Sequence, residues 1–350
     1  MTPSDSKPIL VIQTAFIGDT ILASSFLKTL HERYPESPLH FVLRKGNESV
    51  INGLPFVEKV WLWDKGAGKV RSLWRLIQEL RRYEFRAVFN IHRHFNSGLI
   101  TALMRSVMKV GFKQNPLSFF YHRKINHRIP HHVSGRDWHE IQRNLQLLQA
   151  YDPSFPMPFE LSHFRPVLPI QTKHTEKVAA YKSTPYVVVA PASVWFTKQW
   201  EESSYTSLVS ALVQKYQVYL IGGPTDKELC DRVKGKTSAV NLCGQLNLLE
   251  SAALMDGAER VFVNDSGPLH LASSVNAKTT AFFCATVPAF GYGPLAQGAI
   301  VLESPEKLDC RPCGLHGHTS CPKGHFKCAK NVTVEMALKT LSSSSSPAAR

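Results

Sequence analysis

The sequence predicts an α/β protein made of two successive doubly wound domains, each with a parallel sheet covered by helices on both faces. First, 350 residues with 43% hydrophobic and 19% charged side chains can bury a large core, and this length fits two domains. Second, apolar runs of strand length alternate with segments of helical spacing along the chain. Third, residues 151–169 contain five prolines, which regular helices and central strands do not accept.

In the first half, the apolar run at residues 9–13 predicts a strand, and residues 21–31 have the spacing of a following helix. Residues 40–43 predict a second strand, and residues 48–51 a further helical segment. The proline-rich stretch then predicts the linker between the domains. We therefore expect the first domain to cover residues 1–165.

In the second half, the alternation of strand and helix restarts near Tyr186. Strands are predicted at residues 186–190, 218–221, 261–264 and 279–283. We therefore expect the second domain to cover residues 166–340. The last ten residues, LSSSSSPAAR, are of low complexity, which predicts a disordered tail over residues 341–350.

The chain is strongly basic, with a formal net charge of +14. Residues 1–165 hold 23 basic and 13 acidic side chains, and residues 65–128 alone hold 14 basic and 2 acidic ones. Such an excess attracts an anionic partner: nucleic acid, a membrane surface or a nucleotide-linked substrate. We expect that partner to meet the first half. The basic side chains of this stretch include Arg71, Arg75, Arg81, Arg82, Arg86, Arg93, Arg105, Lys109, Lys113, Arg123, Lys124 and Arg128.

No apolar run reaches the roughly 18 residues that a membrane-spanning helix needs. The N-terminus has no basic leader before a long apolar segment, which is typical of a cytoplasmic protein. Seven cysteines, an odd number, then favour reduced thiols or a metal site over a disulfide framework.

Four of the cysteines gather near the end of the chain, with His316, His318 and His325 between them. Thiolates in such a cluster, two of them at C-x-x-C spacing, can hold a structural zinc or iron ion tetrahedrally. Reduced structural thiols without an ion are the alternative. The four are Cys310, Cys313, Cys321 and Cys328.

The first candidate site follows the strand at residues 9–13, where Gly18 allows close backbone approach and Asp19 places a carboxylate at the sheet edge. Ligands of open α/β sheets bind beyond the carboxyl ends of the strands. The alternative is that Asp19 caps the helix that starts there.

A second candidate site follows the predicted strand at residues 261–264. Ser266 and Gly267 would present backbone N–H groups at a helix N-terminus, with Pro268 in the first turn, and this geometry binds phosphate. For Asp265 and His270 the alternatives are a helix cap and a partly buried histidine.

The loop after the predicted strand at residues 186–190 forms a third candidate. Ser193 lies in a run of small residues, and Lys198 could supply a point charge for a diphosphate. An ordinary solvated lysine is the alternative. The chain has neither G-x-G-x-x-G nor the P-loop pattern, which argues against an NAD-dependent oxidoreductase and a P-loop nucleotidase.

Together these motifs resemble the ADP-heptose:lipopolysaccharide heptosyltransferases of glycosyltransferase family 9, particularly the heptosyltransferase II branch. The resemblance covers most of the chain from Ile9 to about Leu341. It departs at Ser25, where many members have proline, and at residues 191–193, where Pro-Ala-Ser replaces the usual Pro-Gly-Ala. The motifs that carry it are QTAFIGDTILASSFLKTL, PASVWFTKQW, IGGPTDKE, NDSGPLHLA and CRPCGLHGHTSCPKGHFKC.

The resemblance implies the GT-B architecture: two Rossmann-like domains facing a cleft, the first binding the acceptor and the second the ADP-sugar. It also implies inverting catalysis that needs no metal. By the same resemblance, Asp19 is the general base and Lys198 contacts the donor's diphosphate or ribose. The implied donor-binding residues also include Ser193, Asp226, Glu228, Asp265, Ser266, Gly267 and His270, with Asp226 or Glu228 contacting ribose or adenosine.

The implied reaction moves heptose from ADP-L-glycero-D-manno-heptose to the inner core of lipopolysaccharide. The acceptor is then a lipid A–Kdo/heptose core, and the protein is expected at the inner face of the inner membrane as a peripheral protein. A nucleic-acid partner is not expected, because the basic stretch lacks a recognisable reading motif. The alternatives are a heptosyltransferase for a protein or another glycan, and a non-catalytic protein that binds nucleotide sugars.

Overall fold

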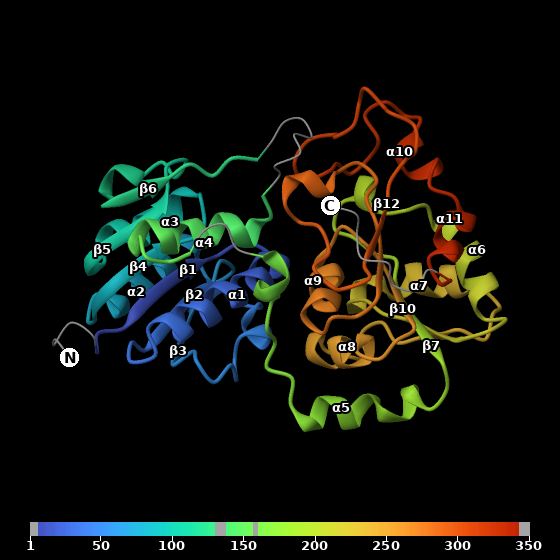
Figure 1. Cartoon of the computed structure of the whole chain (residues 1–350), viewed down its shortest axis with the longest axis horizontal. Coiled ribbons are helices and arrows are strands. Elements are labelled where there is room, and N and C mark those ends of the chain that lie inside the picture. The colour runs from blue at the N-terminus through green and yellow to red at the C-terminus, as the bar shows by residue number, and fades with distance from the viewer. Residues whose placement is uncertain (1–5, 130–137, 157–159, 343–350) are drawn as a thin grey trace. The chain divides into compact units, whose positions relative to one another are not determined.

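The computed structural model describes residues 6–129, 138–156 and 160–342, which form two compact units. The first unit runs up to Pro169 and the second begins at Ile170. Both are doubly wound α/β units, so the predicted fold class is confirmed (Figure 1). Among the described residues, no helix is long and apolar enough to cross a membrane.

The first unit contains a six-stranded, wholly parallel sheet with the strand order β3-β2-β1-β4-β5-β6. Its strands are β1 (Ile9–Gln13), β2 (Leu39–Arg44), β3 (Lys59–Trp63), β4 (Glu84–Asn90), β5 (Arg105–Phe112) and β6 (Arg123–Ile125). Its helices are α1 (Ile17–Arg33), α2 (Lys69–Leu80), α3 (Phe95–Leu103) and α4 (Glu140–Tyr151).

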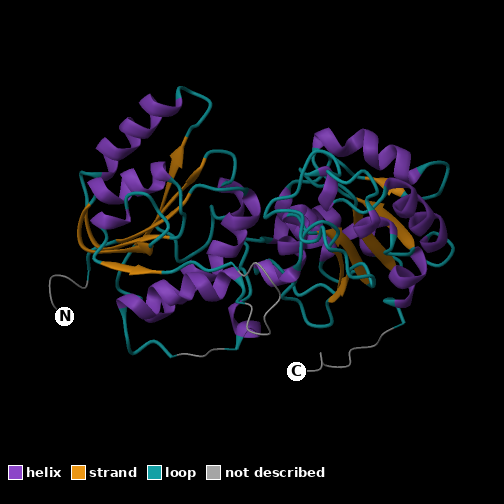
Figure 2. Cartoon of the chain, turned by 90° about the horizontal axis from the view of Figure 1, so that it is seen from above, coloured by secondary structure: helices purple, strands orange, loops and turns teal. Residues whose placement is uncertain are grey.

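Helices cover both faces of this sheet (Figure 2). All five residues of β1 are buried, as expected for a central parallel strand, and Leu10 and Ile12 pack with α2 and α3. On the other face α4 packs against α1. Strand order reverses between β1 and β4, and this switch point opens the crevice where such sheets bind ligands.

The second unit repeats the topology, with the order β12-β11-β10-β7-β8-β9 and a switch point between β7 and β10. Its strands are β7 (Tyr186–Ala190), β8 (Gln217–Leu220), β9 (Val240–Asn241), β10 (Arg260–Asn264), β11 (Thr279–Phe282) and β12 (Ile300–Leu302). Its helices are α5 (Thr172–Val178), α6 (Glu202–Leu212), α7 (Lys227–Lys234), α8 (Leu248–Met255), α9 (Gly267–Ser274), α10 (Lys327–Lys330) and α11 (Val334–Lys339).

The predicted strands at residues 9–13 and 186–190 are confirmed as β1 and β7, and the other predicted strands shift by a residue or so at their ends. Two predictions differ more. The first helix begins at Ile17, four residues early, and the segment at 48–51 is a single 3₁₀ turn, Glu48–Val50. Left-handed glycines at Gly46 and Gly53 leave room for no more than such a turn.

After Tyr151, which ends α4, the described part of the proline-rich stretch is irregular apart from one 3₁₀ turn, Leu161–Phe164, as its composition predicted. Six strands were not predicted: β3, β4, β5, β6, β9 and β12. Of these, β4 is a central strand that pairs with β1. Residues 343–350 of the predicted disordered tail lie outside the described residues.

Candidate active site

Asp19 lies in the first turn of α1, directly beyond the carboxyl end of β1. Phe16, not Asp19, is the N-cap residue of this helix. Burial, and after it the charge of Glu140, raise the pKa of Asp19 to about 6, although the backbone N–H groups of Phe16 and Asp19 and the charge of Arg93 oppose the rise. A carboxyl with a pKa this near neutrality is suited to accept a proton.

Neutral and cationic groups surround the same crevice. The Lys65 Nζ donates to the Thr14 carbonyl oxygen at 2.8 Å, and the Thr14 Oγ1 lies 3.0 Å from His92 Nδ1. The ring of His94 lies 4.5 Å from that of His92. Burial, with the charges of His94, Lys65 and Arg93, lowers the pKa of His92 to about 3, so this ring is neutral at pH 7.

Glu140 opens α4 and is the carboxylate that acts on Asp19. Its Oε2 accepts from His127 Nε2 at 2.9 Å and from Arg143 Nη1 at 3.1 Å, and all three side chains are buried. Burial alone would raise the pKa of Glu140, but His127 and Arg143 outweigh it and lower the pKa to about 2. Glu140 is therefore a fixed negative charge in the interior of the unit. No sequence motif identified it.

In the second unit, Asn264 at the end of β10 ties the switch point together. Its Oδ1 accepts from the Trp200 N–H and from the Tyr205 hydroxyl, both at 2.9 Å, and its Nδ2 donates to the Pro191 carbonyl oxygen at 2.8 Å. Every polar atom of this buried amide is thus used. These hydrogen bonds fix the loop 191–200 beside α9. No role was predicted for Asn264 beyond its place in the motif.

Lys198 and Asp265, from two of the predicted motifs, form an ion pair of 2.7 Å between Nζ and Oδ2. Their side chains are only 17% and 7% exposed, so Lys198 is not the solvated lysine of the alternative. The Thr286 hydroxyl donates to the same Oδ2 at 2.6 Å. A partly dehydrated lysine held in place is suited to an anionic ligand.

The predicted helix N-terminus is confirmed. Ser266 is the N-cap of α9, its side chain makes no capping hydrogen bond, and Pro268 stands in the first turn. His270 is fully buried on the same helix, and burial lowers its pKa to about 4, so it is neutral at pH 7. Within the described part of the chain, its Nδ1 has no hydrogen-bond partner.

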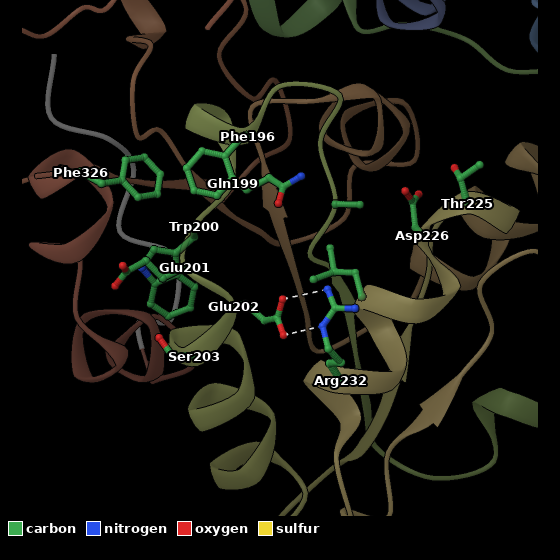
Figure 3. A pocket seen from close by; sticks show the side chains of 12 residues that line it. Phe196, Gln199, Trp200, Glu201, Glu202, Ser203, Thr225, Asp226, Arg232 and Phe326 are labelled. Carbon is green, nitrogen blue, oxygen red and sulfur yellow. Dashed lines mark hydrogen bonds and ion pairs between the residues drawn. The ribbon is translucent and has the colours of Figure 1, made fainter. Parts of the chain in front are cut away.

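A cavity of about 640 Å³ opens between the start of α6, the start of α7 and the loop after β7. Figure 3 shows Asp226 and Thr225 across from Phe196 and Phe326, with a paired Glu202 and Arg232 below. Asp226 lines this cavity, and its Oδ2 accepts the Gly223 N–H at 2.8 Å.

Two further residues predicted to bind the sugar-nucleotide donor, Glu228 and Ser193, make fewer contacts around the cavity and the lysine loop, residues 191–200. Glu228 is exposed in the first turn of α7 and does not line the cavity. Ser193 is half-buried, and its carbonyl oxygen accepts from Gln199 Nε2 at 2.7 Å.

The four late cysteines are free thiols. Among the residues that the structure describes, no three or more His, Cys, Asp or Glu side chains are arranged to hold a metal ion. Cys310 Sγ lies 3.7 Å from His325 Nε2, but His325 Nδ1 accepts the Lys327 N–H. The His325 proton is thereby placed on Nε2, which leaves no lone pair there for a metal. The side chains as they stand do not fit a metal site, and a shared ion stays a prediction.

The basic stretch at residues 65–128 does not act as one surface. Arg86 donates to the Tyr151 and Ser37 hydroxyls, and Lys109 donates to the Ala102 carbonyl oxygen at 2.7 Å, so both serve the interior of the unit. The exposed bases lie in two parts of the unit. One group is on α2 and just after it: Lys69, Arg71, Arg75, Arg81 and Arg82. The other is on and around β5 and β6: Arg105, Lys113, Arg123, Lys124 and Arg128.

The fold is shared with solved heptosyltransferases. The structure of Escherichia coli ADP-heptose lipopolysaccharide heptosyltransferase II is 20% identical and has a TM-score of 0.74, covering 95% of this chain and 97% of that one. Escherichia coli heptosyltransferase WaaC, solved with ADP, is 18% identical with a TM-score of 0.72, covering 95% and 98%. The chain thus has the fold of GT-B glycosyltransferases.

Sequence comparison narrows the class to a family. The profile of glycosyltransferase family 9 (heptosyltransferase) matches residues 73–318. Lipopolysaccharide heptosyltransferase 3 of Escherichia coli K12 is 24% identical over 288 residues, which cover 78% of this chain and 81% of that protein. The chain belongs to glycosyltransferase family 9 and is a glycosyltransferase.

Proposed function

We propose that this protein transfers heptose from ADP-L-glycero-D-manno-heptose to the inner core of lipopolysaccharide, with inversion at the anomeric carbon. The observation that carries the proposal is that each unit holds one site, and that the two sites suit different chemical tasks. One unit holds a carboxyl of raised pKa, Asp19, and the other holds a partly buried lysine, Lys198, beside a free helix N-terminus. The names of its relatives, lipopolysaccharide heptosyltransferases, support the choice of donor and acceptor.

The donor's diphosphate would bind at the start of α9. The N–H groups of Ser266 and Gly267 point from a helix N-terminus, which favours anions. Lys198 would exchange part of its contact with Asp265 for a phosphate oxygen, and Ser193 lies in the same loop. These groups would stabilise the negative charge that develops on ADP as it leaves, so we infer that the reaction itself needs no metal ion.

For the adenosine end of the donor we favour Asp226 over Glu228. Asp226 lines the cavity beside the loop that carries Lys198, whereas Glu228 lies outside it. A carboxylate in this place can accept hydrogen bonds from ribose hydroxyls. His270, neutral and buried behind the first turn of α9, would support the helix N-terminus without adding charge.

Asp19 would act as the general base. The acceptor hydroxyl oxygen attacks the anomeric carbon and forms the new glycosidic bond while the bond from that carbon to the ADP oxygen breaks. The hydroxyl proton passes to Asp19, and the electron pair of the broken bond leaves with ADP. With a pKa of about 6, Asp19 is ionised at pH 7 and still basic enough to take a proton.

The acceptor is anionic and carried by a lipid, and α2 has the surface for both properties. Val70 is 80% exposed and Trp74 50% exposed on its outer face, among the exposed bases of α2. Aromatic and basic side chains on one helix face are typical of contact with an anionic membrane surface. We infer peripheral contact with the inner face of the inner membrane through this helix.

The deciding experiment is incubation with ADP-heptose and a panel of truncated lipopolysaccharide cores, followed by mass spectrometry of the products. We expect a heptose to be added to an inner-core acceptor with release of ADP. If ADP is released only with a protein or another glycan present, the acceptor assignment is wrong. If donor binds but no acceptor yields ADP, the chain is a nucleotide-sugar-binding protein.

A further inference from the structure

Three segments that lie far apart in the sequence meet beside Lys198. The Thr197 N–H donates to the His318 carbonyl oxygen at 3.1 Å, and the His318 N–H donates back to Thr197 Oγ1 at 2.8 Å. The Ala285 N–H donates to the Thr197 carbonyl oxygen at 3.1 Å, and the Ala285 carbonyl oxygen accepts from the Cys313 N–H at 2.8 Å. The loop after β7, the loop after β11 and the cysteine-rich segment 310–328 are thus joined.

Arg311 of the cysteine-rich segment holds the loop after β11. Its Nε donates to the Cys284 carbonyl oxygen at 2.6 Å, and its Nη2 donates to the carbonyl oxygens of Phe283 at 3.0 Å and Thr286 at 2.8 Å. Glu303 pairs with the same Nη2. The side chain is 13% exposed, so these bonds are largely protected from water. One planar guanidinium therefore holds three backbone carbonyl oxygens within residues 283–286.

Thr286 connects that loop to the donor site. It is 1% exposed, and its hydroxyl donates to Asp265 Oδ2 at 2.6 Å. Lys198 Nζ binds the same oxygen at 2.7 Å. The direction in which Asp265 presents its carboxylate to Lys198 is therefore set by a threonine whose backbone is held by Arg311.

Gly317 of the cysteine-rich segment lies directly against the lysine loop. Its φ is +78°, and a Cβ there would lie 3.0 Å from Thr197 Oγ1, 3.1 Å from Trp195 Cβ and 3.2 Å from Lys198 Cγ. Only glycine accepts both the left-handed backbone and this closeness. The segment thus packs directly against Lys198 and its neighbours in the loop.

We propose that Thr286 and Arg311 are positioning residues of the donor site, and that the cysteine-rich segment exists in this protein to hold Lys198 and Asp265 in register for a nucleotide diphosphate. Neither residue touches the ligand in this account. Thr286 acts through Asp265, and Arg311 acts through the backbone of Thr286. The inference rests on the proposed donor site at Lys198.

The test is calorimetric titration of the full chain with ADP. Thr286→Val keeps the shape of the side chain and removes its hydroxyl, and we expect ADP affinity to fall about tenfold, because a hydrogen bond to a charged group is lost. Thr286→Ser restores the hydroxyl and should restore the affinity. In a Lys198→Met background, Thr286→Val should cause little further loss, because the residue it positions is gone.

Thr280→Val is the matched control. Thr280 is a fully buried threonine of β11 whose hydroxyl lies 2.7 Å from that of Thr340, away from the lysine loop. It should lower the melting temperature and leave ADP affinity unchanged. Arg311→Lys is the second positioning variant, which keeps the charge, should weaken ADP binding and should likewise add little to Lys198→Met.

The outcomes separate the two proposals. If the wild-type protein does not bind ADP, the proposed donor site and this inference both fall. If it binds ADP and folded Thr286→Val or Arg311→Lys binds equally well, only the positioning role is overturned. The same holds if Thr286→Val weakens binding equally with and without Lys198, or if Thr280→Val has the same effect.

Discussion

The two units have the same topology, but the carboxylates at their switch points lie in opposite electrostatic surroundings. In each, the sheet order reverses beside its first strand, and a carboxylate stands just beyond the strand ends. In the first unit, burial and the like charge of Glu140 raise the pKa of Asp19 to about 6. Asp265 of the second unit has a lysine 2.7 Å away. The fold places a carboxylate at each switch point. The surrounding loops and helices decide whether that carboxylate can serve as a base or is paired with a cation that can bind an anion.

Asp19→Asn should impair the first of these two sites most strongly. Asparagine can still accept the Phe16 N–H, but it cannot take the acceptor's proton, so we expect turnover to fall by ~10²–10⁴-fold. ADP affinity should be unchanged, because it belongs to the other unit. Steady-state turnover and calorimetry check this. Asp152→Asn, which alters a carboxylate paired with Arg33 and Tyr34 in the same unit, is the control. Near-normal turnover in the folded Asp19→Asn protein would leave Asp19 a purely structural residue.

Lys198→Met tests the other side. We expect ADP to bind about 10–100-fold more weakly, because a charged contact to a diphosphate is lost. The variant should also be less stable, since it leaves Asp265 buried without its cation. Lys182→Met removes a half-buried lysine of the same unit that donates to the Asp256 carbonyl oxygen, and it should change neither property greatly. Unchanged ADP affinity in Lys198→Met would remove this residue from the site.

The raised pKa of Asp19 has a cost in stability whose sign can be worked out. A carboxyl with a pKa of 3.8 when unfolded and about 6 when folded holds its proton more tightly in the folded protein. The free energy of unfolding therefore loses a contribution as the pH rises from about 4 to 6. Asp19→Asn should be more stable than wild type by about 3 kcal/mol at pH 7, and equally stable below pH 4.

Denaturant titrations of both proteins at several pH values measure this difference. In wild type, turnover should fall about tenfold per unit as the pH drops well below 6, because the protonated base cannot act. If Asp19→Asn is no more stable than wild type at pH 7, ionisation of Asp19 does not destabilise the folded protein, and the predicted rise in its pKa is wrong.

Replacing bases on and near α2 should have a smaller effect. It tests a difference between the units, because a membrane role is proposed for the first unit alone. Replacing Arg71, Arg75 and Arg82 with glutamine should weaken binding to vesicles that contain phosphatidylglycerol by at least about tenfold at low salt. The exposed lysines Lys173, Lys177 and Lys236, replaced in the same way, are the control. Raised ionic strength should increase the Michaelis constant for acceptor more than the dissociation constant for ADP. Vesicle binding that ignores both charge and salt would contradict the proposal.

The smallest effect is expected from chelation. Because lysine and backbone N–H groups are assigned to the diphosphate, dialysis against a chelator should leave turnover unchanged. Any zinc or iron at Cys310, Cys313, Cys321 and Cys328 would be structural, and its removal would lower the melting temperature instead. Elemental analysis before and after dialysis identifies the ion. Turnover that is lost on chelation and restored by a metal ion would contradict the assignment.

Features that depend on neighbouring residues along the chain could be predicted without the structure. The strands at residues 9–13 and 186–190, the free N-terminus of α9 and the placement of Asp19 just after β1 all follow from local apolar runs and small residues. Tertiary structure decided the rest, because charge and burial come from residues that are distant in sequence. Glu140 reaches Asp19 from α4, and Lys198 meets Asp265 only when β7 and β10 lie side by side. Thr286 lies outside the motifs, and Arg311 has no predicted role within its motif, because their hydrogen bonds exist only where three separate segments fold together.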